Sequence, residues 1–161
     1  MYRPILASLV FILSEDKKNV LLVHRNKRAG DQHLGKYNGL GGKMEKNEDI
    51  LSCAIREVQE EAAVTISDVE LRGTVSWPGF GKKGEDWFGF IFLAHGFQGD
   101  PKMSNEEGDL HWKPIAELGN LPMWEGDKFF LPLVFDENPR PFHGSMPYEN
   151  GRPVSWTCSR G

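Results

Sequence analysis

Residues 42–64 read GKMEKNEDILSCAIREVQEEAAV, which places a glycine turn directly before an amphipathic helix. Apolar residues recur there at steps of three and four, the spacing that puts side chains on one face of a helix packed against a core. We expect Asn47 to cap this helix, and Glu48 and Asp49 to suit the positive potential of its first turn. The apolar stripe comprises Leu51, Ala54, Ile55, Val58 and Ala62.

The same helix carries three carboxylates away from its apolar stripe. Glu57, Glu60 and Glu61 stand at i, i+3 and i+4, so their side chains lie side by side. Two unit charges about 5 Å apart cost on the order of 3 kcal/mol at an effective dielectric of roughly 20. A divalent cation between them would remove this cost, and oxygen-only ligands favour Mg²⁺ or Mn²⁺ over zinc. The alternative is a solvated acidic helix face, the usual origin of a run of glutamates.

The spacing of the whole stretch favours the metal site. Gly42, five residues, Glu48, seven residues and then Arg56–Glu61 (REVQEE) match the signature of the Nudix hydrolases, with Val64 in its final aliphatic position. The chain thus resembles that superfamily. Ala63 stands where the family usually has a glycine that ends the helix in a left-handed conformation. A side chain in that conformation costs roughly 1 kcal/mol.

Length and composition bound the organisation of the chain. Its 161 residues suffice for a sizeable core and show no linker, so we predict a single domain over residues 1–161. A net charge of −4 argues against stable nucleic-acid binding. The apolar run Ile5–Leu13 is too short to cross a bilayer and lacks a signal-peptide cleavage site. Cys53 and Cys158 lack metal-ligand spacing and are expected to be reduced thiols, so we expect a soluble, cytoplasmic protein without a membrane partner.

Outside the central helix the chain is rich in strand signals. Asp86–Phe97 is apolar on both alternating faces, which predicts a strand covered on both sides. Pro114–Leu118 is expected to form one helical turn, and Lys128–Phe135 a second helix with Pro132 in its early part. Asn150–Gly151 signals a hairpin turn. The other predicted strands are Ile5–Ser14, Asn19–Arg25, Val69–Trp77, Arg140–Met146 and Pro153–Cys158. This order predicts an α+β layered sandwich, which the resemblance narrows to a Nudix α/β/α sandwich with a mixed central sheet.

Three loops carry candidate ligand contacts. The polar loop of residues 26–36 carries or adjoins five basic side chains: Arg25, Lys27, Arg28, His33 and Lys36. For each of them, an ordinary solvated loop and a phosphate contact are equally good interpretations. Lys43 is the better candidate, because it neighbours the glycine turn. Trp77 and Phe80 could line a pocket for a flat base, although core packing is favoured. The acidic segment of residues 105–112 is either a solvated loop or the source of a carboxylate that completes a metal shell.

Four further runs make the resemblance more specific. In order along the chain they are KYNGLGGK (36–43), MW (123–124), FLPL (130–133) and FHG (142–144). They resemble the mammalian oxidised-purine nucleoside triphosphatases, the 8-oxo-dGTP diphosphatases related to bacterial MutT. The resemblance implies Mg²⁺-dependent hydrolysis of an oxidised purine nucleoside triphosphate, such as 8-oxo-dGTP, to the monophosphate and pyrophosphate. It also implies a role in sanitation of the nucleotide pool.

The resemblance also assigns residues to roles. Mg²⁺, with Mn²⁺ as a substitute, would be held by Glu57, Glu60, Glu61, Glu107 and the Gly41 carbonyl. The implied catalytic set is Glu57, Glu60, Glu61 and Arg56, with Arg56 holding a carboxylate and Glu57 or Glu61 favoured as the base. Asn38 would hydrogen-bond the purine edge, Trp124 would pack on the base and Asp127 would contact its Watson–Crick edge, with Lys43 and Trp77 completing the substrate-binding set. Gly126 replaces the first of two adjacent aspartates that the family usually carries, which bears on the choice of purine.

Other functions stay open at this point. A different Nudix substrate, such as a nucleotide sugar or the 5′ end of an RNA, would use the same metal site. A non-catalytic nucleotide-binding module is expected to lose a glutamate of the signature, and this chain keeps them all. The sequence leaves open whether the protein is a monomer or a dimer.

Overall fold

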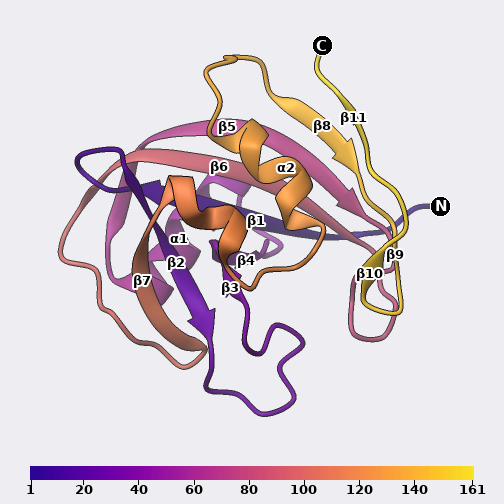
Figure 1. Ribbon diagram of the computed structural model, residues 1–161, viewed down its shortest axis with the longest axis horizontal. Coiled ribbons are helices and arrows are strands. Elements are labelled where there is room, and N and C mark those ends of the chain that lie inside the picture. Colours follow the sequence, from indigo (N-terminus) through magenta and orange to yellow (C-terminus); the bar gives the residue numbers. More distant parts are fainter.

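A mixed sheet of nine strands lies between two helical layers in the computed structural model, which describes residues 1–161 (Figure 1). The strands are β1 (Ile5–Leu13), β2 (Asn19–Arg25), β3 (Tyr37–Asn38), β4 (Leu40–Lys43), β5 (Thr65–Trp77), β6 (Trp87–Gln98), β7 (Gly108–Pro114), β8 (Phe142–Ser145) and β11 (Thr157–Ser159). Their order is β11-β8-β5-β6-β1-β2-β3, with β4 paired to β1 and β7 to β2. The helices are α1 (Ile50–Ala62), α2 (Asp127–Val134) and a 3₁₀ helix (Ile115–Asn120). The predicted α/β/α sandwich with a mixed sheet is confirmed.

The two helical layers bury separate cores on the two faces of the sheet. Ala54, Val58 and Ala62 of α1 pack on one face, and α2 packs on the other, in front of the sheet in Figure 1. Residues of β6 alternate between these cores, with Phe92 facing α1 and Ile91 facing the α2 layer. The prediction that this strand is covered on both sides is confirmed. No helix of the structure is long and apolar enough to cross a membrane.

Strand β1 forks the sheet beside the glycine turn. Its residues 7–10 pair antiparallel with β4, whereas residues 12–13 pair antiparallel with β2. Along its other edge β1 runs parallel to β6. The Gly41 N–H of β4 donates to Glu61 Oε2 of α1 at 3.1 Å. The fork therefore places the backbone of the glycine turn against the carboxylates of the helix.

The start of α1 differs from the prediction. Asp49, and not Asn47, is the N-cap residue, and its Oδ1 accepts from the Ser52 N–H at 2.8 Å. Glu48 lies before the helix, where its carboxylate accepts from the Glu45 N–H at 2.8 Å. Neither acid lies in the first turn of the helix, because the helix begins only at Ile50.

The prediction that Leu51 belongs to the buried apolar stripe is also wrong. The Leu51 side chain is 42% exposed, whereas Cys53, which was not assigned to the stripe, is fully buried. Cys53 precedes Ala54 and lies on the same side of the helix as the buried Ala54 and Val58. The buried face of α1 is therefore rotated slightly from the predicted one.

The end of α1 adopts the left-handed conformation that the position of Ala63 in the signature indicated. Ala63 has φ 59° and ψ 30°, and its N–H donates to the Gln59 carbonyl at 3.0 Å. A left-handed residue at this position is normally glycine, because the Cβ atom crowds the backbone. The helix is therefore closed by an alanine in a conformation that favours glycine.

Replacing this alanine should stabilise the protein. We expect Ala63→Gly to raise the free energy of unfolding by up to about 1 kcal/mol, since strain is relieved despite the greater freedom of glycine in the unfolded chain. Ala63→Val is the matched control and should be destabilising, because a β-branched residue fits a positive φ poorly. Thermal melts of both variants test this. A lower melting temperature for Ala63→Gly would reject the strained cap.

Helix α2 also differs from the prediction. Pro132 is the sixth of the eight residues of α2, and not in its early part. The carbonyls of Leu133 and Val134 accept from the Arg72 side chain of β5, which is only 2% exposed. This buried arginine holds the C-terminal end of α2 on the sheet, and no feature of the sequence pattern indicated it.

The C-terminal segment forms two short pairings. Asn150–Gly151 turns the chain between β9 (Tyr148–Glu149) and β10 (Arg152–Pro153), with both turn residues at positive φ, so the predicted hairpin is confirmed. The predicted strand Pro153–Cys158 is interrupted, because only residues 157–159 form β11 on β8. The acidic segment is also only partly a loop, since β7 begins at Gly108.

Candidate active site

An acidic cavity of about 580 Å³ opens beside α1. Glu57, Glu60 and Glu61 of the helix line it together with Glu107 from the loop before β7. All four side chains predicted to hold a metal therefore face one space. Its remaining lining residues are three basic residues, two neutral polar residues and one further acid: Lys27, Arg28, Lys102, Ser104, Asn105 and Glu106.

The surroundings of two carboxylates in this cavity disfavour their ionised forms. Burial raises the pKa of Glu61 well above its ordinary value, the charge of Glu107 raises it further, and the Gly41 N–H opposes the shift. Burial also raises the pKa of Glu57, whereas the hydrogen bond from Arg56 lowers it. A cation in the cavity would favour the ionised form of both groups.

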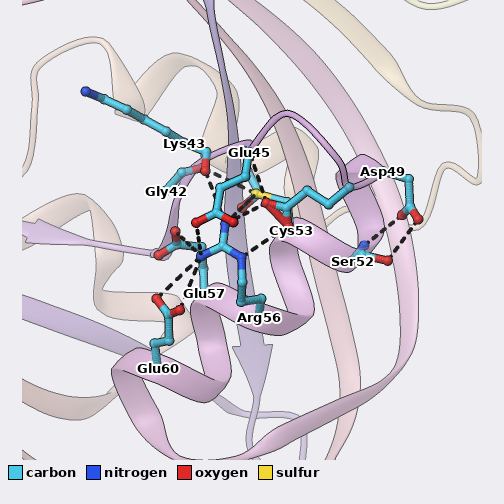
Figure 2. Close-up of polar contacts among 11 residues, drawn as sticks. Gly42, Lys43, Glu45, Asp49, Ser52, Cys53, Arg56, Glu57 and Glu60 are labelled. Atoms are coloured by element: carbon cyan, nitrogen blue, oxygen red, sulfur yellow. Dashed lines mark hydrogen bonds and ion pairs between the residues drawn. The ribbon is translucent and has the colours of Figure 1, made fainter.

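Arg56 connects the carboxylates of the signature (Figure 2). Its Nη2 donates to Glu48 Oε1 at 2.7 Å and its Nη1 to Glu57 Oε1 at 2.9 Å. Nη1 also lies 3.4 Å from Glu60 Oε1, and Nη2 donates to the Lys43 carbonyl at 3.3 Å. One guanidinium thus contacts three acidic side chains and a backbone carbonyl.

The two glycines of the turn allow a close approach that no other residue permits. Gly41 has φ 143°, and a Cβ atom there would lie 2.0 Å from the Ser8 carbonyl oxygen. A Cβ atom on Gly42 would lie 2.6 Å from the carboxyl carbon of Glu57. Gly41 therefore lets the turn pack closely on β1, and Gly42 lets the Glu57 carboxylate lie directly on the backbone of residue 42.

The donor set fits a hard divalent cation, although the side chains are not yet arranged around one. Oxygen atoms from carboxylates and a backbone carbonyl are the ligands that Mg²⁺ prefers. No three His, Cys, Asp or Glu side chains converge closely enough to form a metal site as they stand. Arg56 instead holds Glu57 and Glu60. Binding would therefore require Glu57 and Glu60, which already line the cavity, to shift from Arg56 toward the cation.

Magnesium should stabilise the folded protein. Because a cation would bind the clustered carboxylates of the folded state only, we expect the melting temperature to rise with Mg²⁺ concentration. Turnover should stop in excess EDTA and return when Mg²⁺ is restored. The charge variant Glu61→Gln should show a smaller Mg²⁺-dependent rise in melting temperature. Full activity in excess EDTA would contradict this prediction.

A second cavity of about 470 Å³ adjoins the first, and Arg28 and Glu107 line both. Every residue predicted to bind the substrate lines this second cavity: Asn38, Lys43, Trp77, Trp124 and Asp127. Gly41, the predicted carbonyl ligand, lines it as well. The structure therefore gathers the predicted site residues other than Arg56 into two adjoining spaces.

Part of the lining of the second cavity, called here the aromatic cavity, consists of aromatic side chains. Phe80 lies with its ring centroid 4.8 Å from that of Trp124 and 6.0 Å from that of Trp77. Trp77 and Phe80 also pack against the core on the α2 side of the sheet. The alternatives of core packing and pocket lining are therefore both realised. Flat apolar walls of this kind suit a planar ring system.

Polar groups without partners accompany these walls. The Asn38 Nδ2 atom is buried and has no hydrogen-bond partner, so it is available to a ligand. Burial raises the pKa of Asp127 to about 7, although the charge of Lys36 opposes the shift. Asp127 can therefore present either an acceptor or a donor near neutral pH.

Gly126 lies against two side chains that leave little room for a Cβ atom. A Cβ atom at this position would lie 2.1 Å from Met146 Sδ and 2.4 Å from Tyr148 Oη. An aspartate could not occupy residue 126 without displacing both side chains. Asp127 is therefore the acidic side chain that this part of the cavity provides.

Sequence reasoning missed a residue that orders the acidic loop. Asn105 Oδ1 accepts from the Glu107 N–H at 2.8 Å, and Asn105 Nδ2 donates to the Glu61 carbonyl at 3.0 Å. This side chain ties the loop that carries Glu107 to the end of α1. An asparagine two residues before a loop carboxylate is a known turn signal and could have indicated it.

A sheet between two helical layers, with a glycine turn packed on a helix rich in carboxylates, defines the fold and site of a Nudix hydrolase. The model of the NUDIX domain family matches residues 3–134, so the chain belongs to the Nudix family. Nudix hydrolases generally use a divalent metal such as Mg²⁺ and act on small nucleotide substrates.

Relatives and solved structures agree with this membership. The uncharacterized Nudix hydrolase YvcI of Bacillus subtilis is 31% identical over 141 residues, covering 85% of this chain and 83% of the relative. The oxidized purine nucleoside triphosphate hydrolase of Danio rerio is 29% identical, covering 85% of this chain and 83% of the relative. The mutator MutT protein of Bacillus halodurans superposes with a TM-score of 0.81 at 28% identity, over 96% of this chain and 97% of that protein.

Proposed function

We propose that this protein hydrolyses oxidised purine nucleoside triphosphates, such as 8-oxo-dGTP, to the nucleoside monophosphate and pyrophosphate. One observation carries the proposal: an aromatic cavity with Asn38 and Asp127 adjoins the carboxylate cavity, and Arg28 and Glu107 line both. A purine base would fit the aromatic cavity, and a triphosphate chain would fit the carboxylate cavity. The name of the Danio rerio relative supports this substrate class.

The carboxylate cavity would carry out the phosphate chemistry. Glu57, Glu60, Glu61, Glu107 and the Gly41 carbonyl would hold Mg²⁺. When bound, this ion supplies polarisation of the phosphate chain and a lowered pKa of the attacking water. The basic side chains of Lys27, Arg28 and Lys102 in the cavity wall would neutralise negative charge on the phosphates.

Two glutamates suit the role of base. Burial raises the pKa of Glu57 and of Glu61, which makes each of them a stronger base than an exposed glutamate. Glu60 is largely exposed, and its side chain is 60% accessible. Arg56 would hold Glu57 and the signature residue Glu48 in place through charge-assisted hydrogen bonds.

The proposal is tested by a substrate panel. We expect kcat/KM with Mg²⁺ to be highest for an oxidised purine triphosphate among 8-oxo-dGTP, 2-hydroxy-dATP, dGTP and dATP. A nucleotide sugar and a 5′-triphosphate RNA serve as the competing substrates. Preferred hydrolysis of either one would replace the proposal with another Nudix activity. Binding of nucleotides without turnover of any would indicate a non-catalytic module.

Asp127 should set the preference for guanine-type bases. Ionised Asp127 accepts hydrogen bonds from the N1–H and 2-amino groups of guanine or 8-oxoguanine, whereas adenine offers only its 6-amino donor. Loss of one charged hydrogen bond costs on the order of 1.5 to 3 kcal/mol, or roughly ten- to a hundredfold in kcat/KM. Asp127→Asn should therefore remove much of the preference of the enzyme for 8-oxo-dGTP over dATP.

The same preference should depend on pH. Because the pKa of Asp127 is raised to about 7, the carboxylate is protonated below that pH and ionised above it. The ratio of kcat/KM for 8-oxo-dGTP to that for dATP should rise as the pH increases through about 7, and should be flat in Asp127→Asn. Asp100→Asn, at an exposed site, is the control and should change nothing. An unchanged ratio in Asp127→Asn would show that the base is read elsewhere, with Asn38 the first alternative.

A further inference from the structure

The indole of Trp124 is fixed by a hydrogen bond from a distant part of the chain. Its Nε1–H donates to His33 Nδ1 at 2.6 Å, and the two rings meet edge to face with centroids 5.4 Å apart. Both residues line the aromatic cavity. The contact therefore lies in the wall of the proposed base pocket.

His33 is suited to accept this bond at all ordinary pH values. Burial lowers its pKa to about 4, and the charge of Arg25 lowers it further, although Asp31 opposes the shift. A neutral imidazole keeps a lone pair on Nδ1, which is the atom that faces the indole N–H. The proton of the neutral ring is then on Nε2.

The backbone of His33 is itself held in place. Its N–H donates to Asp31 Oδ1 at 3.0 Å, and Asp31 Oδ2 accepts from Arg25 Nε at 2.9 Å. Arg25 Nη1 in turn lies 3.5 Å from Glu107 Oε2 in the wall of the acidic cavity. A continuous polar path thus runs from the carboxylates to the edge of Trp124.

The other contacts of the Trp124 ring do not involve its Nε1 atom. Lys36 Nζ lies 4.6 Å from the centroid of the Trp124 ring, and Phe80 packs against the ring as well. Both contacts pack against the ring, but neither of them is a hydrogen bond to Nε1. Without His33 the buried indole N–H would lack an acceptor, which would favour a different orientation of the ring.

We propose that His33 is a positioning residue for purine recognition, because its Nδ1 fixes the orientation in which the Trp124 ring lies against the base. The inference rests on the proposed function and adds a specificity-determining residue to it. His33 touches neither the phosphates nor the water in this account. Its loss should therefore weaken substrate binding and leave the chemical step nearly unchanged.

Paired substitutions test the hydrogen bond. His33→Leu should raise the KM for 8-oxo-dGTP by about tenfold, the scale of one buried hydrogen bond, with kcat changed by less than about twofold. His33→Asn, which can keep an oxygen near the Nδ1 position, should have a KM close to that of the wild type. In a Trp124→Phe background, which lacks the indole N–H, His33→Leu should have no further effect. A KM unchanged by His33→Leu, or an equal rise in the Trp124→Phe background, would overturn the proposal.

A spectroscopic measurement decides the point without turnover. The indole ¹H–¹⁵N resonance of Trp124, assigned by its loss in Trp124→Phe, should shift in His33→Asn only slightly and in His33→Leu strongly upfield. If the wild type hydrolyses no purine triphosphate, the proposed function fails, but this resonance still tests the positioning contact. An indole resonance that is the same in the wild type and in His33→Leu would overturn the inference. If His33→Leu does not fold, a KM for His33→Asn well above that of the wild type would overturn it instead.

Discussion

Replacing Glu61 by glutamine should lower kcat by at least about a hundredfold and leave the fold intact. Glu61 is the most strongly perturbed carboxylate of the acidic cavity, through burial and the charge of Glu107. A glutamine keeps the size of the side chain and an oxygen that can accept from the Gly41 N–H. It loses the negative charge and the ability to take a proton. Steady-state kinetics with Mg²⁺ and a thermal melt of the same preparation measure both effects.

Two further variants make this result specific. Glu60→Gln should cause a loss of similar size if the exposed member of the cluster also acts on the metal. Glu117→Gln, in the 3₁₀ helix and exposed to solvent, is the matched control and should have normal turnover. Near-normal kcat in both Glu60→Gln and Glu61→Gln would mean that the signature glutamates do not take part in catalysis.

Replacing Arg72 by methionine should lower the free energy of unfolding by about 2 to 4 kcal/mol, the scale of leaving several hydrogen-bond acceptors without a donor. Arg72 Nε donates to the Val134 carbonyl at 2.9 Å, and Arg72 Nη2 donates to Asp136 Oδ1 at 2.9 Å. Its Nη1 donates to Glu70 Oε2 at 3.1 Å. Methionine can fill the space, but it leaves the carbonyls at the end of α2 without their donor.

Urea unfolding of the purified variant measures this loss. Arg72→Lys keeps the charge but not the planar fork of donors, so it should be destabilised by an intermediate amount. Arg72 lines neither cavity, and the KM of the folded fraction should therefore stay close to that of the wild type. A loss below about 1 kcal/mol for Arg72→Met would contradict the role assigned to the buried guanidinium.

The parts of the fold that follow from local patterns were predictable from the sequence. The period of apolar residues located α1, and the alternation in residues 86–97 gave a strand covered on both faces, because each pattern reports burial directly. The unusual alanine at residue 63 indicated a left-handed helix end, which the structure has. The cap at Asp49 and the exposed Leu51 were missed because several neighbouring residues fit each position equally well.

The site was predictable only where residues could be matched to a signature. Residues as far apart as Asn38 and Asp127 line one cavity, as the resemblance implied, although their roles in binding stay predictions. The contact of His33 with Trp124 joins residues 91 positions apart, and Arg72 reaches Val134 across 62 positions. Such pairings depend on how the layers pack, and no local period in a single sequence reports them.

The identity of the products tests the central claim most directly. 8-oxo-dGTP is incubated with the protein and Mg²⁺, and the products are separated and quantified, with Glu61→Gln as the inactive control. We expect equal amounts of 8-oxo-dGMP and pyrophosphate, with no inorganic phosphate as a first product. Release of 8-oxo-dGDP and phosphate, or no cleavage at all, would contradict it.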